Sequence, residues 1–69
     1  MKLSARNQIK ARVVEIKAGE AIANVVLDAG GQRLVASVTV EAVNDLGLSE
    51  GSEVTALIKA SDVLLATGD

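Results

Sequence analysis

Two short clusters of hydrogen-bond donors lie near the two ends of this chain, Ser4-Ala5-Arg6-Asn7-Gln8 and Lys59-Ala60-Ser61. The sequence between them is rich in Val, Leu, Ile and Ala, and the chain contains no His, no Cys and no aromatic residue. Hydroxyl, amide, guanidinium and ammonium groups donate several hydrogen bonds, and the last two are positively charged. A site built from these groups suits an anion that only accepts hydrogen bonds.

The same composition argues against several kinds of catalytic and metal site. Without His or Cys the chain lacks the usual general bases and nucleophiles, and its carboxylates are scattered over turns and exposed faces. Disulfides and the usual zinc sites are excluded as well. We therefore predict a binding protein and not an enzyme.

The size and apolar content of the chain predict self-association. The 69 residues are interpreted as one domain spanning 1–69, and a chain this small hides only about 60% of its unfolded surface on folding. Hydrophobic residues make up 49% of the sequence, and the mean hydropathy is +0.37. Since this is more apolar surface than one small core can cover, we predict an obligate homo-oligomer.

The charge balance limits the kinds of partner that the protein is expected to bind. Seven Lys and Arg residues against nine Asp and Glu give a net charge of −2, which argues against general nucleic-acid binding. The missing aromatic residues remove the stacking surfaces of single-strand binders. No apolar segment has the length of a signal peptide core or a membrane span. The expected protein is cytoplasmic and has no membrane or nucleic-acid partner.

Strands are predicted along most of the chain, because apolar residues recur with a period of two. In the first strand the alternation changes phase at Val13-Val14, which predicts a β-bulge that coils the strand. Glycines in 28–32 predict a turn. The expected strands span residues 7–17, 21–27, 33–38, 53–59 and 63–66.

One segment between the third and fourth strands has helical spacing instead. Val40, Val43 and Leu46 recur at every third residue. Thr39 suits the N-cap of this helix, and Gly47 suits its C-terminal stop. Five strands with one short helix between the third and fourth form the order of an all-β, OB-like small barrel. An SH3-like barrel is the nearest alternative.

Four stretches in order along the chain carry a family resemblance. They are Ser4-Ala5-Arg6-Asn7-Gln8-Ile9, Val38-Thr39, Leu46-Gly47-Leu48-x-x-Gly51-x-x-Val54 and Ile58-Lys59-Ala60-Ser61-x-Val63. Together they resemble molbindins, the small molybdate-binding proteins also called molybdenum-pterin-binding proteins. The resemblance runs from residue 3 to about residue 66.

This resemblance implies a function and a set of site residues. A molbindin has an OB-like fold, assembles as a homohexamer (a trimer of dimers) and stores or buffers molybdate or tungstate between subunits. The metal enters as the oxyanion and is not coordinated by side chains, and no organic cofactor is implied. One subunit supplies the early donors and the Lys-Ala-Ser turn, and a neighbour supplies the Thr before the helix. The implied positions are Ser4, Arg6, Asn7, Lys59, Ala60, Ser61 and Thr39.

One position departs from the family pattern. Some relatives carry a hydroxyl residue within the first helical turn, where this chain has Ala42. A contact from that position would come from the backbone.

Each implied site residue also has a simpler interpretation. Residues 4–7 are alternatively a solvated terminal segment, and Arg6 alternatively binds backbone carbonyls across an interface. Lys59 is alternatively an ordinary lysine at a strand end, and Ser61 a turn residue bonded to its own backbone. Thr39 is alternatively only a helix cap, although the free N–H groups there also suit an oxyanion. Ala60 would act through its amide.

Two other functions compete with oxyanion storage. A small OB-like or SH3-like adaptor would bind a protein or an oligonucleotide, but the exposed aromatic or basic groove expected of it is missing. A fragment of a transporter ATPase is the other alternative, and the complete set of motifs argues against it.

Overall fold

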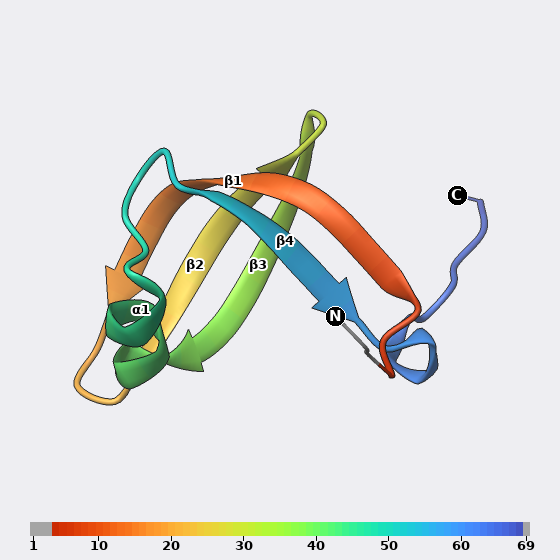
Figure 1. The fold of residues 1–69 in the computed structure, drawn as a ribbon. Helices are drawn as coiled ribbons and strands as arrows, with labels where there is room; N and C mark the ends of the chain where they lie inside the picture. The colour runs from red at the N-terminus through yellow and green to blue at the C-terminus, as the bar shows by residue number, and fades with distance from the viewer. Residues whose placement is uncertain (1–3, 69) are drawn as a thin grey trace.

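The computed structural model describes residues 4–68 as one curled antiparallel sheet with a short helix, a mostly-β, OB-like architecture (Figure 1). Residues 1–3 and 69 of the predicted domain lie outside the described residues. The sheet order is β3-β2-β1-β4, so β3 and β4 are its edges. The elements in chain order are β1 (Asn7–Ala18), β2 (Ile22–Ala29), β3 (Gln32–Thr39), α1 (Val40–Leu46), β4 (Glu53–Ile58) and the 3₁₀ turn η1 (Ala60–Asp62).

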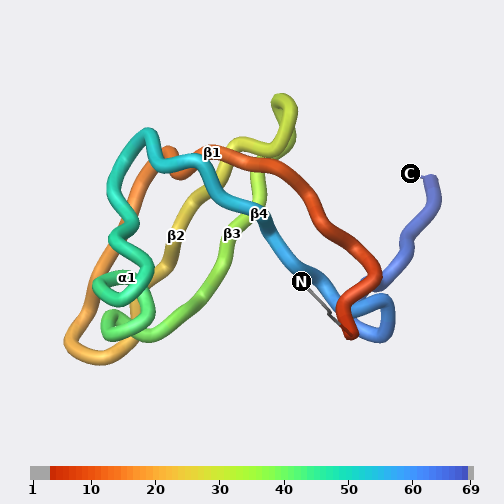
Figure 2. The backbone as a smooth tube through the Cα atoms, in the orientation of Figure 1, coloured from red at the N-terminus to blue at the C-terminus, as the bar shows by residue number. Residues whose placement is uncertain are grey.

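The long strand β1 bends at the predicted bulge (Figure 2). Its first half pairs with β4 and its second half with β2, and the register with β2 shifts between Val13 and Glu15. At the bend, the Val13 N–H donates to the Ser52 carbonyl at 2.9 Å, and the Val13 carbonyl accepts from the Gly51 N–H at 2.8 Å. The bulge is confirmed, and it lets one strand serve both halves of the sheet.

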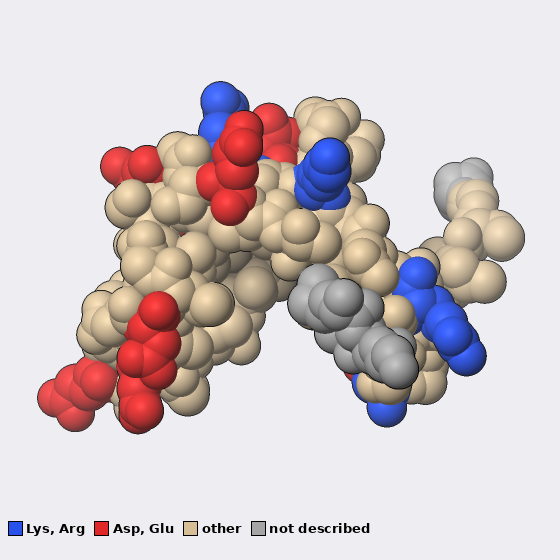
Figure 3. Space-filling model, in the orientation of Figure 1, with Lys and Arg blue, Asp and Glu red and all other residues tan. Residues whose placement is uncertain are grey.

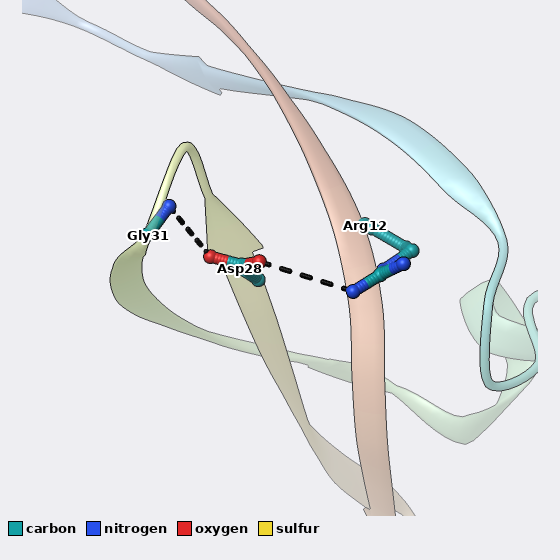
Figure 4. A network of polar contacts seen from close by, with 3 residues as sticks. All are labelled: Arg12, Asp28 and Gly31. Carbon is teal, nitrogen blue, oxygen red and sulfur yellow. Dashed lines mark hydrogen bonds and ion pairs between the residues drawn. The ribbon is translucent and has the colours of Figure 1, made fainter.

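The β2–β3 hairpin is tighter than predicted. Only Gly30 and Gly31 lie between the paired residues Ala29 and Gln32, and their φ values are +62° and +90°. Two consecutive positive φ angles are typical of a two-residue hairpin turn. Asp28 fixes the turn, because its Oδ1 accepts from the Gly31 N–H at 2.8 Å (Figure 4). Both strands therefore extend beyond their expected ends.

The short helix α1 begins and ends where predicted. The Thr39 hydroxyl accepts from the Ala42 N–H at 3.0 Å, which makes Thr39 the N-cap. Gly47 ends the helix with φ +64°, a left-handed conformation that favours glycine. Val43 is buried and anchors the helix to the core beneath β2 and β3. No helix within residues 4–68 is long and apolar enough to cross a membrane.

The core lies on the inner face of the curled sheet. Alternate residues of β1 and β2 point into it, together with one helical residue, as the strand period requires. Val13 and Val25 are almost fully buried, at 1% and 2% exposure. The buried residues among 4–68 are Ala11, Val13, Ala23, Val25, Leu27 and Val43.

The predicted fifth strand differs from the structure. Residues 63–66 follow η1 and pair with no strand among residues 4–68. They lead away from the sheet (Figure 1), and Leu64 and Leu65 are 91% and 92% exposed. Because η1 turns the chain away after β4, these residues do not bridge the two edge strands, and the single chain leaves its barrel open.

Candidate oxyanion site

The pairing of β1 with β4 brings the two donor clusters to one end of the sheet. Asn7, the first residue of β1, lies opposite Ile58, the last residue of β4. The Asn7 amide Nδ2 donates to the Ile58 carbonyl at 3.1 Å and ties the two strands together there. Residues 4–6 and 59–61 therefore extend from the same end, as Figure 1 shows.

The donors of this end are open to solvent. The side chains of Ser4, Arg6, Lys59 and Ser61 are exposed, and Asn7 is half-buried. Within the segments 4–7 and 59–62, the two cations Arg6 and Lys59 outnumber the one carboxylate, at Asp62 in η1, so this cluster carries net positive charge. Figure 3 shows Lys and Arg atoms at this end, whereas Asp and Glu atoms cover the region of α1. The cluster is suited to attract an anion.

The η1 turn adds backbone donors to the cluster. Its hydrogen bonds run from the Asp62 N–H to the Lys59 carbonyl (2.9 Å) and from the Val63 N–H to the Ala60 carbonyl (3.3 Å). The first N–H groups of a helical turn have no acceptor within the turn. The amides of Ala60 and Ser61 occupy these positions, so Ala60 can contribute although its side chain has no polar atom.

Thr39 lies at the other end of the molecule. It ends β3 opposite Ile22, next to the β1–β2 connection, whereas the donor cluster adjoins the start of β1. The 12 residues of β1 separate the two places, a path of roughly 40 Å in a straight strand and less in a bent one. One chain does not bring Thr39 to the other predicted residues, so any site that includes all of them needs a second chain.

The local geometry of Thr39 is compatible with both interpretations of this residue. Its hydroxyl oxygen accepts the capping bond from the Ala42 N–H, and its proton is still free to donate. Glu41 adds a carboxylate in the same helical turn. An anion here therefore needs cations from elsewhere, because the helix start supplies none of its own.

An apolar groove between the edge strands was missed by the sequence reasoning. It has a volume of ≈ 490 Å³, and its walls are formed by the inner faces of β3 and β4 and by two leucines flanking Gly47. The alternation of apolar and polar residues within each strand indicates that these residues share a face. It does not indicate that the barrel stays open. The groove-lining residues of these walls include Leu34, Ala36, Val38, Val54, Ala56, Leu46 and Leu48.

Known proteins similar to this chain support the fold and the molbindin resemblance. The TOBE domain family matches residues 3–65. The chain belongs to this family. It is 46% identical over 66 residues to molybdenum-pterin-binding protein 3 of Clostridium pasteurianum, and the match covers 94% of this chain and 97% of that protein. A probable molybdenum-pterin-binding protein of Haemophilus influenzae is also 46% identical, over 94% of this chain and 96% of its own length.

Two solved structures superpose closely on the chain. A molybdate-binding protein from Sporomusa ovata gives a TM-score of 0.93 at 43% identity and covers 97% of this chain and 100% of its own. ModG, described as a cytoplasmic molybdate-binding protein and solved with molybdate bound, gives 0.88 at 43% identity and covers 93% of this chain and 46% of its own. The molbindin resemblance and the predicted fold class are confirmed.

Proposed function

We propose that this chain binds molybdate at interfaces between copies of itself and buffers or stores the ion in the cytoplasm. The observation that carries the proposal is the β1–β4 pairing at Asn7 and Ile58, which gathers both donor clusters at one positively charged end. The similarity to proteins named for molybdate or molybdenum-pterin binding supports the same ligand.

The donor set matches the chemistry of the ion. Molybdate at neutral pH is a tetrahedral dianion whose four oxygens only accept hydrogen bonds. Arg6 and Lys59 supply charge-assisted donors, and Ser4 and Ser61 supply hydroxyl donors. Backbone amides at Ala60 and Ser61 complete this half of the site. Tungstate has the same charge and shape and suits the same groups, whereas phosphate keeps a proton near pH 7 and gains less from a site made of donors alone.

The second half of the site comes from a neighbouring chain in this proposal. Thr39 lies at the opposite end of the molecule, so its contribution reaches the donor cluster only across an interface. Binding an ion between two chains would also stabilise the assembly, because the ligand binds only the associated state. We propose the homohexamer, a trimer of dimers, as that assembly.

The open barrel supports self-association independently of the ion. Residues 63–66 form an extended apolar segment without charge, and Leu64 and Leu65 are almost fully exposed. The groove between β3 and β4 is apolar, and both strands have free edges there. A neighbour's segment can pair with a free edge and bury its leucines, which contributes about 1.5–3 kcal/mol for each leucine fully buried. We therefore assign the groove to a second copy.

Isothermal titration calorimetry with sodium molybdate tests the site. Arg6→Ala and Lys59→Ala each remove a charged donor, so we expect the dissociation constant to rise by roughly one to two orders of magnitude. Lys10→Ala is the matched control, because Lys10 is an exposed cation on the outer face of β1. The molybdate affinity of this variant should equal that of the wild type. Unchanged binding in both site variants would disprove the assignment.

A mixing experiment tests whether the site spans two chains. Arg6→Ala and Thr39→Ala alone should each bind molybdate weakly. Co-refolding them should restore wild-type affinity in a fraction of the sites, because some interfaces then join an intact Arg6 to an intact Thr39. Native mass spectrometry verifies that mixed oligomers have formed. If these mixed oligomers do not regain molybdate affinity, both residues act within one chain and the proposal is contradicted.

A further inference from the structure

A row of alternating charges crosses all four strands on the outer face of the sheet. Arg33 of β3 lies opposite Asp28 of β2, Asp28 lies opposite Arg12 of β1, and Arg12 lies opposite Glu53 of β4. Directly opposed residues point to the same side of a sheet. The neighbouring positions Ala11, Val13 and Leu27 point into the core, so the row faces outward and reads plus, minus, plus, minus from edge to edge.

Within the part of the chain that the structure describes, the centre of this row is its only ion pair. Arg12 Nη2 lies 3.9 Å from Asp28 Oδ2 (Figure 4). Among residues 4–68, Arg33 and Glu53 form no ion pair within 4.0 Å. Both are exposed, and Figure 3 shows basic and acidic atoms side by side along the top of the arch. The outer charges of the row are therefore available to a partner.

Apolar residues adjoin the charged row on the same face. Val35 lies opposite Val26 in the next outward row, and Val14 lies at the bulge of β1, where it has no partner in β2. Val14 and Val35 are 47% and 49% exposed. A charged row beside exposed valines has the composition of an interaction surface, with polar pairing for orientation and apolar area for burial.

The charge order of the row makes it complementary to itself. A two-fold axis that runs parallel to the strands, between β1 and β2, places β4 of a second copy over β3 and β1 over β2. Glu53 then faces the second copy's Arg33, and Arg12 faces its Asp28, so all four contacts join opposite charges. The other in-plane two-fold axis, perpendicular to the strands, would place like charges together.

We propose that this outer face is an interface between two copies of the chain, distinct from the groove and from the oxyanion site. The sheet curls away from the axis, so Arg12 and Asp28 of the two copies approach most closely and form an alternating group of four charges. Arg33 and Glu53 lie across wider gaps at the edges, where opposite charges attract each other over a longer distance. Such exposed pairs weaken as salt rises, because the screening length falls from about 10 Å at 0.1 M to about 3 Å at 1 M.

A charge-reversal experiment tests this interface without molybdate. All chains carry Leu64→Ser and Leu65→Ser, so that the groove contact does not contribute. We expect the parent to associate at low salt and to dissociate at high salt in sedimentation velocity. An acidic variant, Arg12→Glu/Arg33→Glu, should not self-associate, and a basic variant, Glu53→Arg, should associate roughly tenfold more weakly than the parent. Asp28 is left intact because it also fixes the hairpin turn.

The decisive measurement mixes the acidic and basic variants. Three of the four contacts are then attractive, so native mass spectrometry should show a mixed dimer that forms more readily than either self-dimer. Repulsion within each chain is unchanged by mixing, so recovery reports only the contact between copies. Glu20→Arg makes the same charge change in the β1–β2 turn and should leave association as in the parent. The proposal would be overturned if the association of the parent did not depend on salt. It would also be overturned if the mixture formed no more dimer than the acidic or the basic variant alone.

Discussion

The two ends of this molecule differ in how completely the chain satisfies its own groups. Around Val13, Val25 and α1, alternate side chains are buried and the helix is capped at both ends. At the end that carries residues 4–7 and η1, donors are exposed, and the segment after η1 leaves two leucines almost fully exposed. Both ends belong to the same sheet and share β1.

This difference distinguishes the contacts that stabilise a single chain from the contacts that we propose join several chains. The well-packed end depends on contacts that a lone chain already makes. The open end presents the donors for an ion and an apolar segment, and the groove runs along β3 and β4 to the leucines that flank Gly47. Substitutions at the first end should therefore act on folding, and those at the second on association or ligand binding.

The largest loss of folding stability is expected for Leu27→Ala. Leu27 is 5% exposed in the core, and truncating a buried leucine lowers the free energy of unfolding by about 2–5 kcal/mol. Denaturant unfolding followed by circular dichroism measures this loss. Leu57→Ala is the control, because Leu57 lies on the outer face of β4 and is 45% exposed. Equal losses in both variants would remove the distinction between core and surface.

The next effect should appear in association and not in the fold of the single chain. Leu64→Ser/Leu65→Ser removes two apolar side chains from the proposed contact, and we expect association to weaken by about two orders of magnitude or more. The wild-type melting temperature should rise with protein concentration, and that of the variant should rise much less. Leu64→Ile/Leu65→Ile keeps the apolar volume and should restore the dependence. An unchanged concentration dependence in the serine variant would refute a role for this segment.

A smaller effect is expected at the C-terminus of α1. Gly47 has φ +64°, and a Cβ added there would meet no atom within 4 Å, so Gly47→Ala should act through backbone strain alone. We expect the free energy of unfolding to fall by about 1 kcal/mol. Gly47→Asn should lose less, since asparagine tolerates the left-handed region better. Thermal unfolding at one protein concentration compares the wild type with the two variants. An alanine variant as stable as the wild type would contradict the strain argument.

Local patterns predicted most of the fold. The phase change at Val13-Val14 marked the bulge, and the order Thr39, three apolar residues and Gly47 marked the short helix, because both signals depend on neighbours a few residues apart. The hairpin was predicted too wide, since two glycines are compatible with several turns. Barrel closure was not predictable locally, because it depends on where η1 directs the chain after Ile58.

For the candidate site, the sequence by itself determined the chemistry and the tertiary structure decided the placement. Residue types alone indicated donors for an anion and excluded His, Cys and aromatic chemistry. Only the pairing of Asn7 with Ile58 joined residues 51 positions apart, and only the length of β1 separated Thr39 from them. The charged row likewise depends on strand register, because a shift of one strand by one residue would turn that strand's charged side chain to the other face.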